Sequence, residues 1–194
     1  MALASPAPRV LADVVTRSWV RNIALVIAGA AFVGVSAQIA IPLPFTPVPL
    51  TLQTFAVLLA AAALGSMRGV AAMTLYAVAG AAGFPWFAEA SSGFSAPSFG
   101  YIVGFIVAAF VVGRIAEQGA TRSAVRTAGL MVVGNVIIYA VGVTWLKNSL
   151  DASWSDAIAW GLTPFLIGDA IKVAAAAGLF PATWRGLKKA GLSE

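Results

Sequence analysis

One acid and one base lie inside an otherwise apolar run near the end of the sequence. Asp169 and Lys172 fall within residues 163–180, where the other residues are apolar or small. Because three positions separate them, a helix would place both on one face. A charge within a membrane span costs about 2.5–3.5 kcal/mol on insertion scales, so such residues usually face a bundle interior or a water-filled cavity. Asp169 and Lys172 are therefore candidate ligand-binding residues, and a purely structural ion pair between helices is the alternative.

Composition places this pair in a membrane protein. The chain has 194 residues, of which 60% are hydrophobic and 10% are charged. Soluble domains carry about 25% charged residues, so the sequence predicts an integral, all-α membrane protein. Its long apolar segments leave no length for a soluble domain beside them, and residues 1–194 are expected to form one domain.

The same composition excludes several kinds of chemistry. The sequence has no His and no Cys, which excludes disulfides, the common zinc and iron–sulfur sites and acyl transfer through a Ser–His pair. No phosphate-binding Gly-x-x-x-x-Gly-Lys-Ser/Thr motif occurs, so any use of ATP belongs to another chain. We expect no cofactor and no metal. The net charge of +5 comes from basic residues that flank apolar segments, which does not indicate nucleic acid as a partner.

Six apolar segments are long enough, or nearly so, to cross a bilayer. The first resembles a secretion signal, but it continues for about 20 residues with other spans behind it, so we expect a retained helix. Residues 1–20 would precede the bundle and residues 184–194 would form a tail. The expected spans are 22–41, 51–65, 70–84, 101–116, 127–146 and 164–183.

Three connections between these spans have distinctive sequences. Alternate prolines in 42–49 exclude a helix, so the chain should run extended there. Residues 84–100 form a long loop of aromatic, small and turn-forming residues, and such loops are usually functional. Residues 153–161 predict a short helix at the membrane surface, capped by Ser153. Thr163 as a cap and Pro164 at the first helical position predict the start of the last span.

Basic residues predict the orientation. Ten of the 12 Lys and Arg residues fall on the side of the N-terminus if there are six spans, which predicts that both termini are cytoplasmic. Lys147 alone lies on the outer side and Lys172 lies within a span. The three distinctive connections and the start of the last span then converge outside the membrane. This arrangement predicts a small-molecule pocket near the outer surface, covered by loops.

Further polar and aromatic residues are candidates for this pocket. Asn135 and Tyr139 are four residues apart, so they share a helix face that could extend a polar wall toward Asp169; hydrogen bonds between helices are the alternative. Gln53 and Thr51 open the second span, where they could instead cap its free N–H groups. Aromatic residues of the loops could cover a ligand or anchor the chain at the interface. The remaining candidates for ligand contact are Phe45, Phe87, Ser92 and Tyr101.

The first span carries two small-xxx-small patterns, Ala24 with Ala28 and Ala30 with Gly34. Such patterns allow another helix to approach closely. The partner helix could belong to another subunit or to the same bundle, so these residues are candidates for a docking face.

The segment 37–55, AQIAIPLPFTPVPLTLQTF, closely resembles the signature of BioY, the biotin-specific S component of energy-coupling-factor vitamin transporters. Residues 83–88, 100–105, 135–139 and 164–172 resemble the family in the same order. The resemblance covers about residues 23–187. It implies six helices in a bacterial cell membrane, an outward biotin pocket, and a docking face for a transmembrane coupling subunit driven by paired ATPases.

In this resemblance Asp169 and Lys172 match the family's Asp and Lys. A carboxylate can accept a hydrogen bond from a ureido N–H of biotin, and an ammonium can donate to the ureido carbonyl or to the valerate carboxylate. The sequence departs from the family at Glu89-Ala90, where a glycine pair is usual, and at Phe99.

The sequence therefore predicts a biotin-capturing subunit that imports the vitamin with an ATP-driven module. One alternative is a small carrier that works without ATPase subunits. Another is an intramembrane enzyme with Asp169 and Lys172 as an acid–base pair, which lacks an evident nucleophile–base constellation or metal.

Overall fold

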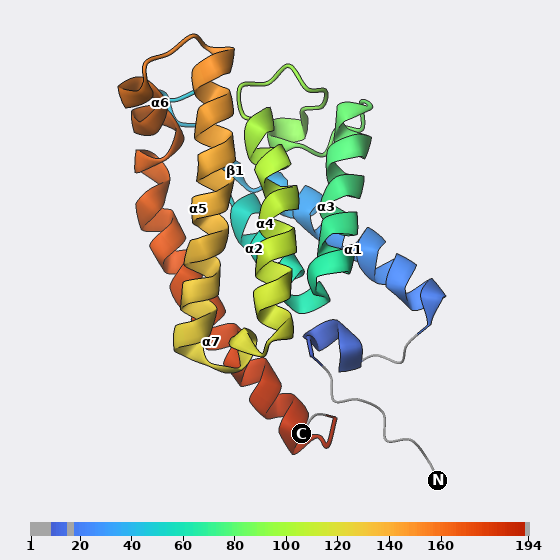
Figure 1. Ribbon diagram of the computed structural model, residues 1–194. Helices are drawn as coiled ribbons and strands as arrows, with labels where there is room; N and C mark the ends of the chain where they lie inside the picture. Colours follow the sequence, from blue (N-terminus) through green and yellow to red (C-terminus); the bar gives the residue numbers. More distant parts are fainter. Residues whose placement is uncertain (1–8, 15–17, 193–194) are drawn as a thin grey trace.

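The structure, a computed structural model, describes residues 9–14 and 18–192, which form helices standing side by side, with α1 inclined across the others (Figure 1). The α-helices are α1 (Trp19–Ala37), α2 (Gln53–Leu64), α3 (Ser66–Ala81), α4 (Phe99–Glu117), α5 (Ala124–Ser149), α6 (Trp154–Gly161) and α7 (Leu166–Lys189). Single turns of 3-10 helix are η1 (Leu11–Val14), η2 (Ala88–Ala90), η3 (Ala120–Arg122) and η4 (Thr163–Phe165). Two short strands, β1 (Ala40–Ile41) and β2 (Leu50–Thr51), pair antiparallel.

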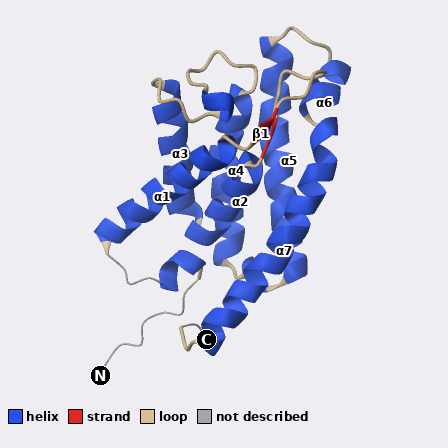
Figure 2. Ribbon diagram, turned by 180° about the vertical axis from the view of Figure 1, so that it is seen from behind, coloured by secondary structure: helices blue, strands red, loops and turns tan. Residues whose placement is uncertain are grey.

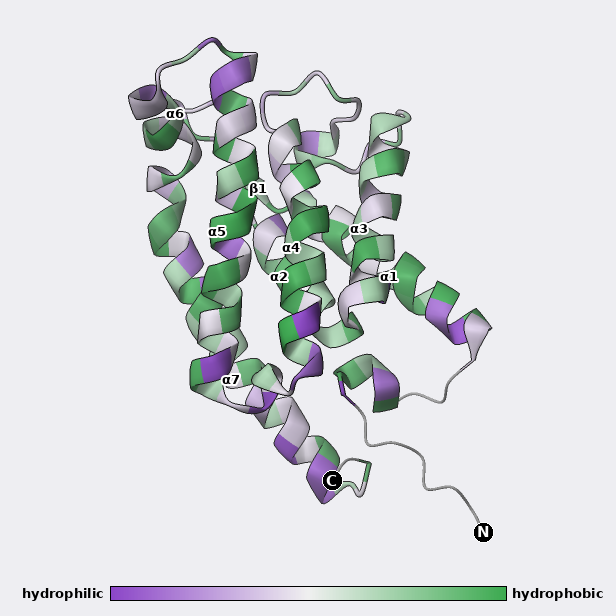
Figure 3. Cartoon of the chain, in the orientation of Figure 1, coloured by the Kyte–Doolittle hydropathy of each residue, from purple (hydrophilic) through white to green (hydrophobic). Residues whose placement is uncertain are grey.

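Within the described residues, four helical stretches are long and apolar enough to cross a membrane. They are Trp19–Ala37, Phe99–Glu117, Ala124–Ser149 and Trp154–Lys189. The middle of these helices consists mostly of hydrophobic residues, while hydrophilic residues lie mainly toward the ends of the bundle (Figure 3). The chain is therefore a multi-pass membrane protein, as its composition predicts.

The helix α2 is apolar but too short to cross a bilayer by itself. Its 12 residues rise about 18 Å, less than the ~30 Å hydrocarbon core. The segment before it, 38–52, contains β1, the proline loop and β2 (Figure 2). Irregular backbone at membrane depth is tolerated only where protein buries it or where it lines a cavity.

The helix positions agree broadly with the predicted segments, which overlap α1 to α5 and α7. The short helix predicted at 153–161 is confirmed as α6, and so is its Ser153 cap, because the backbone N–H of Asp156 donates to Ser153 Oγ at 3.1 Å. The last helical stretch begins near Pro164 as predicted, with Pro164 in its first turn, but the predicted Thr163 cap is wrong. Thr163 donates its hydroxyl back to the carbonyl of Ile158, and Pro164 lies in η4, one turn before α7. The strand pair beside the proline loop was not predicted.

Small residues let the central helices approach closely. A Cβ atom on Gly113 of α4 would lie 2.4 Å from the backbone of Ser66 at the start of α3, so only glycine fits this crossing. The crossing holds the short α2–α3 hairpin against α4 and so fixes the position of the α2 N-terminus.

An ion pair fixes η1 at the end of the bundle where α7 ends (Figure 1). Arg68 donates to Asp13 at 2.6 Å, and the backbone N–H groups of Arg9 and Val10 also donate to Asp13. Burial raises the pKa of Asp13, but these hydrogen bonds and the Arg68 charge outweigh burial and hold it below its ordinary value. The Asp13 contact therefore persists at neutral pH and weakens only in acid.

Candidate functional site

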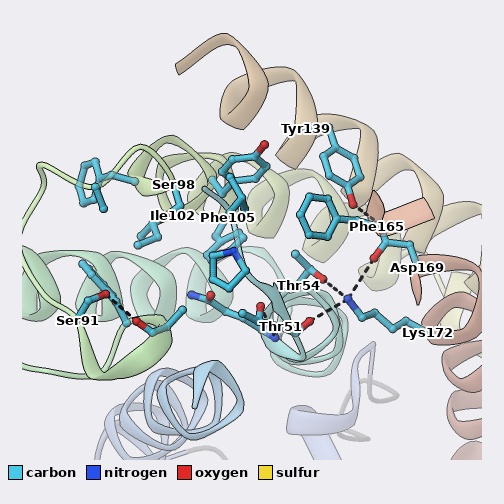
Figure 4. Close-up of a pocket in the computed structure, with 18 residues that line it drawn as sticks. Thr51, Thr54, Ser91, Ser98, Ile102, Phe105, Tyr139, Phe165, Asp169 and Lys172 are labelled. Atoms are coloured by element: carbon cyan, nitrogen blue, oxygen red, sulfur yellow. Dashed lines mark hydrogen bonds and ion pairs between the residues drawn. The ribbon is translucent and has the colours of Figure 1, made fainter. Parts of the chain in front are cut away.

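A pocket lies between the proline loop, the 82–98 loop and four helices (Figure 4). Its volume is about 60 Å³, below the ~300–1,000 Å³ of typical small-molecule sites. A ligand of that class therefore requires the covering loop to move. The lining residues are Val48, Pro49, Thr51, Gln53, Thr54, Phe87, Ala88, Ser91, Ala96, Ser98, Phe99, Tyr101, Ile102, Phe105, Tyr139, Phe165, Asp169 and Lys172.

Asp169 and Lys172 form an ion pair in the wall of this pocket. Lys172 Nζ lies 3.2 Å from Asp169 Oδ1, and the two side chains are 12% and 7% exposed. The hydroxyl of Tyr139 on α5 donates a short hydrogen bond to the other carboxylate oxygen, Oδ2 (Figure 4). The first turn of α7 thus presents an acid that is held from two sides.

The ammonium of Lys172 has an acceptor for each of its three N–H groups. Besides Asp169, it donates to the carbonyl of Thr51 at 3.0 Å and to Thr54 Oγ1 at 2.9 Å. These bonds join α7 to the start of α2. The carboxylate of Asp169 has about four lone-pair sites and accepts two hydrogen bonds, so it can accept further bonds from a ligand. Lys172 has no N–H group left to donate.

The start of α2 contributes Gln53 and Thr51, and both line the pocket. The hydroxyl of Thr51 accepts the backbone N–H of Gln53 at 3.2 Å, which is the capping role that the sequence left open. The Gln53 amide donates to the hydroxyl of Tyr76 at 2.8 Å. Among the described residues, no buried side-chain nitrogen or oxygen lacks a hydrogen-bond partner, so the polar wall is rigidly paired.

Aromatic rings form the opposite wall. Phe87 is 4% exposed and packs edge-on against Tyr76, with ring centroids 5.2 Å apart. The chain of rings continues through Phe99 to Trp145 on α5. Tyr101 is held by its hydroxyl, which donates to the carbonyl of Gly161 at 2.7 Å. This side of the pocket suits a flat apolar group.

Gln38 holds the loop that carries Phe87, and the sequence analysis missed it. Its amide nitrogen lies within 3.1 Å of the carbonyls of Gly34, Trp86 and Phe87, and its amide oxygen accepts the N–H of Ala90 at 3.0 Å. One side chain at the end of α1 thereby positions the pocket loop. The available signal was its place inside the 37–55 segment.

Replacing Gln38 with Leu is expected to loosen this loop. The change removes the hydrogen bonds of Gln38 to the Ala90 N–H and to two loop carbonyls, each of which contributes about 0.5–1.5 kcal/mol. Amide hydrogen exchange should accelerate in residues 86–91 of the variant and stay unchanged in α4 and α5. Thr144→Val, which removes a hydroxyl bonded within its own helix, is the control. Unchanged exchange in 86–91 would show that Gln38 does not hold the loop.

The departure at Glu89-Ala90 has a conformational basis. Both residues adopt left-handed backbone angles, with φ of 59° for Glu89 and 54° for Ala90. Glycine adopts this region without the steric cost that a Cβ atom adds, so a glycine pair would suit the same turn. The turn therefore has the left-handed backbone that suits glycine, and Glu89 and Ala90 are strained in it.

Glu89→Gly is therefore expected to stabilise the protein slightly, by up to about 1 kcal/mol, because the strain of the left-handed region is relieved. Thermal unfolding in detergent measures the shift. Glu89→Ala, which removes the carboxylate and keeps the Cβ atom, controls for charge. A Glu89→Gly variant no more stable than Glu89→Ala would contradict the conformational explanation.

Three predicted contact residues lie away from the pocket. Asn135 is buried on α5 and lines a groove between α5, α6 and α7 on the other side of the Tyr139–Asp169 contact. Phe45 is 61% exposed at the tip of the proline loop. Ser92 is exposed, and its neighbour Ser91 lines the pocket instead. The structure brings together Gln53, Phe87, Tyr101, Tyr139, Asp169 and Lys172.

The small residues of α1 fall on two different faces. Ala30 and Gly34 are buried, and a Cβ atom on Gly34 would meet the Trp86 ring at 3.1 Å, so these residues pack inside the bundle and are not a free docking surface. Ala24 and Ala28 are exposed. Ala28 lines an apolar groove of about 320 Å³ between α1, α2 and α7.

Comparison with known proteins agrees with this architecture. Residues 8–189 match the BioY family. The chain is 40% identical over 150 residues to the biotin transporter BioY of Thermotoga maritima, covering 76% of this chain and 86% of that protein. It is 36% identical over 167 residues to the biotin transporter BioY of Rhodobacter capsulatus, covering 79% and 87%.

A solved structure has the same fold. The S-component for biotin from an ECF-type ABC transporter superposes with a TM-score of 0.76 at 22% identity, covering 86% of this chain and 92% of that one. At that identity the likeness concerns the arrangement of helices.

Proposed function

The chain belongs to the BioY family, a transport family and not an enzyme family, and on that premise we propose that it captures biotin at the pocket beside Asp169. The Asp169–Lys172 pair in the pocket wall is the main observation behind this proposal. Charged residues within an apolar helix are costly, and they usually mark the site of a polar ligand. The relatives are named as biotin transporters, which supports the choice of ligand.

The unequal hydrogen-bonding capacity of the pair assigns their roles. A ureido N–H of biotin would donate to the Asp169 carboxylate, which can accept further bonds. Lys172 would orient that carboxylate, because its three N–H groups already have acceptors. The fused rings of biotin would pack against Phe87 and Phe99, whose ring centroids lie 6.3 Å apart in the pocket wall.

The valerate carboxylate needs a positive partner, and the N-terminus of α4 supplies one. Ser98 precedes α4, makes no side-chain cap bond, and lines the pocket together with Phe99. The helix dipole favours an anion at such a position, even though the N–H groups of Phe99 and Tyr101 already donate to the carbonyls of Ala96 and Ser98. We place the carboxylate there, at the edge covered by the 82–98 loop.

The orientation and partners follow from the basic residues and the exposed face of α1. With six spans and the termini in the cytoplasm of a bacterial cell, the pocket opens outward. We assign the energy source for import to a transmembrane coupling subunit and paired ATPases. The groove that includes Ala28 is the proposed contact for that subunit.

Equilibrium binding of biotin to the purified chain in detergent tests the ligand. Binding should be saturable at one site per chain, and biotin in which the ureido nitrogens are methylated should bind far more weakly, since it cannot donate to Asp169. Absence of biotin binding by folded protein would overturn the proposal. Uptake by vesicles that contain this chain alone would instead support the carrier that works without ATPases.

A further inference from the structure

A large groove lies behind the Tyr139–Asp169 contact, on the side away from the biotin pocket. It runs between α5, α6 and α7, which lie side by side in Figure 1, and its volume is about 700 Å³. That volume falls within the ~300–1,000 Å³ of typical small-molecule sites. Most of the lining side chains are valine, leucine and alanine. The proposed biotin site does not use this space.

One polar side chain in the groove, that of Asn135, has no partner. Asn135 is 9% exposed, and its amide forms no hydrogen bond within the part of the chain that the structure describes. Every fully enclosed side-chain nitrogen or oxygen in that part has a partner, so the amide atoms must reach open space, and the groove lies beside them. The hydroxyls of Tyr139 and Thr144 are already engaged, with Asp169 and with the carbonyl of Ala140. An occupant that pairs with the Asn135 amide is therefore favoured.

Asn135 lies near the middle of α5, and therefore deep in the membrane. Eleven positions separate it from Ala124 at the start of the helix and fourteen from Ser149 at the end, or roughly 16 and 21 Å. Phospholipid head groups lie at the edges of a hydrocarbon core about 30 Å thick, some ~15 Å from its middle. The occupant must therefore carry its polar group into the hydrocarbon core.

This depth and the chemistry of an amide define the polar group. A charge is costly within the core, and the Asp169 carboxylate in the groove wall would repel an anion, so the group is uncharged. The Asn135 amide offers an N–H donor and a carbonyl acceptor. An uncharged carboxyl group offers the matching carbonyl and O–H, so two hydrogen bonds can form. From Asn135 the apolar groove continues to Thr144, about 13 Å along α5, which suits an acyl chain.

We propose that this groove binds one long-chain fatty acid in its uncharged form, with the carboxyl group on the Asn135 amide and the acyl chain running toward Trp154. Trp154 lines the α6 end of the groove and is 53% exposed. An acyl chain of a phospholipid would fill the same space and leave the amide unpaired, so the free amide favours a fatty acid. The inference does not depend on biotin binding.

Two variants test the two ends of this ligand. Asn135→Leu should weaken binding of dodecanoic acid to the purified full chain at least fivefold, because two hydrogen bonds are lost. Leucine is similar in size and more apolar, so a groove that only collects apolar chains would bind the acid as well or better. Ala140→Trp should fill the groove and weaken binding by a similar factor with the amide in place. Native mass spectrometry of the detergent-solubilised protein, titrated with dodecanoic acid, measures both.

A control variant and a control ligand make the result specific. Ala175→Trp places the same bulk on an exposed position of α7 outside the groove and should leave the affinity unchanged. Methyl dodecanoate cannot donate a hydrogen bond and should bind the unaltered chain about threefold more weakly than the acid. This comparison does not depend on the folding of any variant, which thermal unfolding without ligand checks.

Four outcomes would overturn the proposal. The first is no binding of dodecanoic acid by the folded, unaltered chain, and the second is equal binding of the acid and its methyl ester. The third is an unchanged affinity of folded Asn135→Leu for the acid. The fourth is another occupant in the groove: phosphatidylglycerol that displaces the acid, or a second copy of the chain in a dimer that Asn135→Leu dissociates.

Discussion

Asp169→Asn is expected to weaken biotin binding at least tenfold. The substitution replaces a charged acceptor with a neutral one, and hydrogen bonds to charged groups contribute about 1.5–3 kcal/mol, or about 10- to 150-fold in affinity. It also leaves one acceptor oxygen in place of the two that now bind the Tyr139 hydroxyl and the Lys172 ammonium. Calorimetric or radioligand titration of the purified variant measures the change in affinity.

A second effect must be separated from this loss. Asn at 169 leaves the Lys172 ammonium, 12% exposed, without its counter-charge. Breaking a buried ion pair by removing one partner costs about 3–5 kcal/mol of stability. Reduced binding by a partly unfolded variant would then say nothing about the ligand, so unfolding must be measured alongside binding.

A double variant distinguishes a ligand site from a structural pair. Asp169→Leu combined with Lys172→Met removes both charges and keeps similar volumes, and replacement of a buried ion pair by apolar residues is often neutral or stabilising. If the pair is only structural, the double variant recovers both stability and biotin binding. We expect it to recover stability and still fail to bind. Tyr139→Phe, which keeps the pair and removes one hydrogen bond, should fall between wild type and Asp169→Asn.

The energetic cost of a charge in lipid is why Asp169 and Lys172 could be identified from the sequence alone. Gln38 carries no such signal. An uncharged amide at a helix end resembles any exposed polar residue, and its role depends on carbonyls 48 and 49 positions away in the chain. Contacts at that separation are set by how α1 packs against the 82–98 loop, which no local pattern specifies.

Helical periodicity predicted that Asn135 and Tyr139 share a helix face, but it did not predict the position of Asn135 relative to the pocket. One helical turn, about 5.4 Å along α5, separates it from Tyr139. That distance places Asn135 beyond the Asp169 contact, in the groove on the other side. A shared face is therefore necessary for a shared pocket and does not ensure it.

The two small-residue patterns of α1 illustrate a similar limit. Six positions separate Ala24 from Ala30, and at about 100° per residue they point about 120° apart. One pair therefore packs inward whenever the other is exposed. The sequence shows both faces as equally able to accept a helix, and only the packed bundle shows that Ala30 and Gly34 are already covered.

Because Ala28 is exposed while Ala30 and Gly34 are buried, the second large prediction concerns Ala28. Ala28→Trp is expected to reduce biotin uptake about tenfold or more in vesicles that also contain the coupling subunit and ATPases. The indole would fill the apolar groove between α1, α2 and α7, and overpacking a close contact costs about 1–3 kcal/mol. Biotin affinity of the isolated chain should change less than twofold, because the Ala28 side chain does not line the ligand pocket.

Two comparisons make this result specific to docking. Ala174→Trp places the same bulk on an exposed position of α7 outside the groove, and its uptake should remain close to wild type. Gly34→Trp should instead impair binding and uptake together, because Gly34 packs against Trp86 behind the ligand loop. Loss of uptake without loss of binding in Ala28→Trp would show that the exposed face of α1 contacts the partner. Loss of both uptake and binding in Gly34→Trp would show that the buried face supports the pocket. Normal uptake by Ala28→Trp would show that the coupling subunit contacts another face of the bundle.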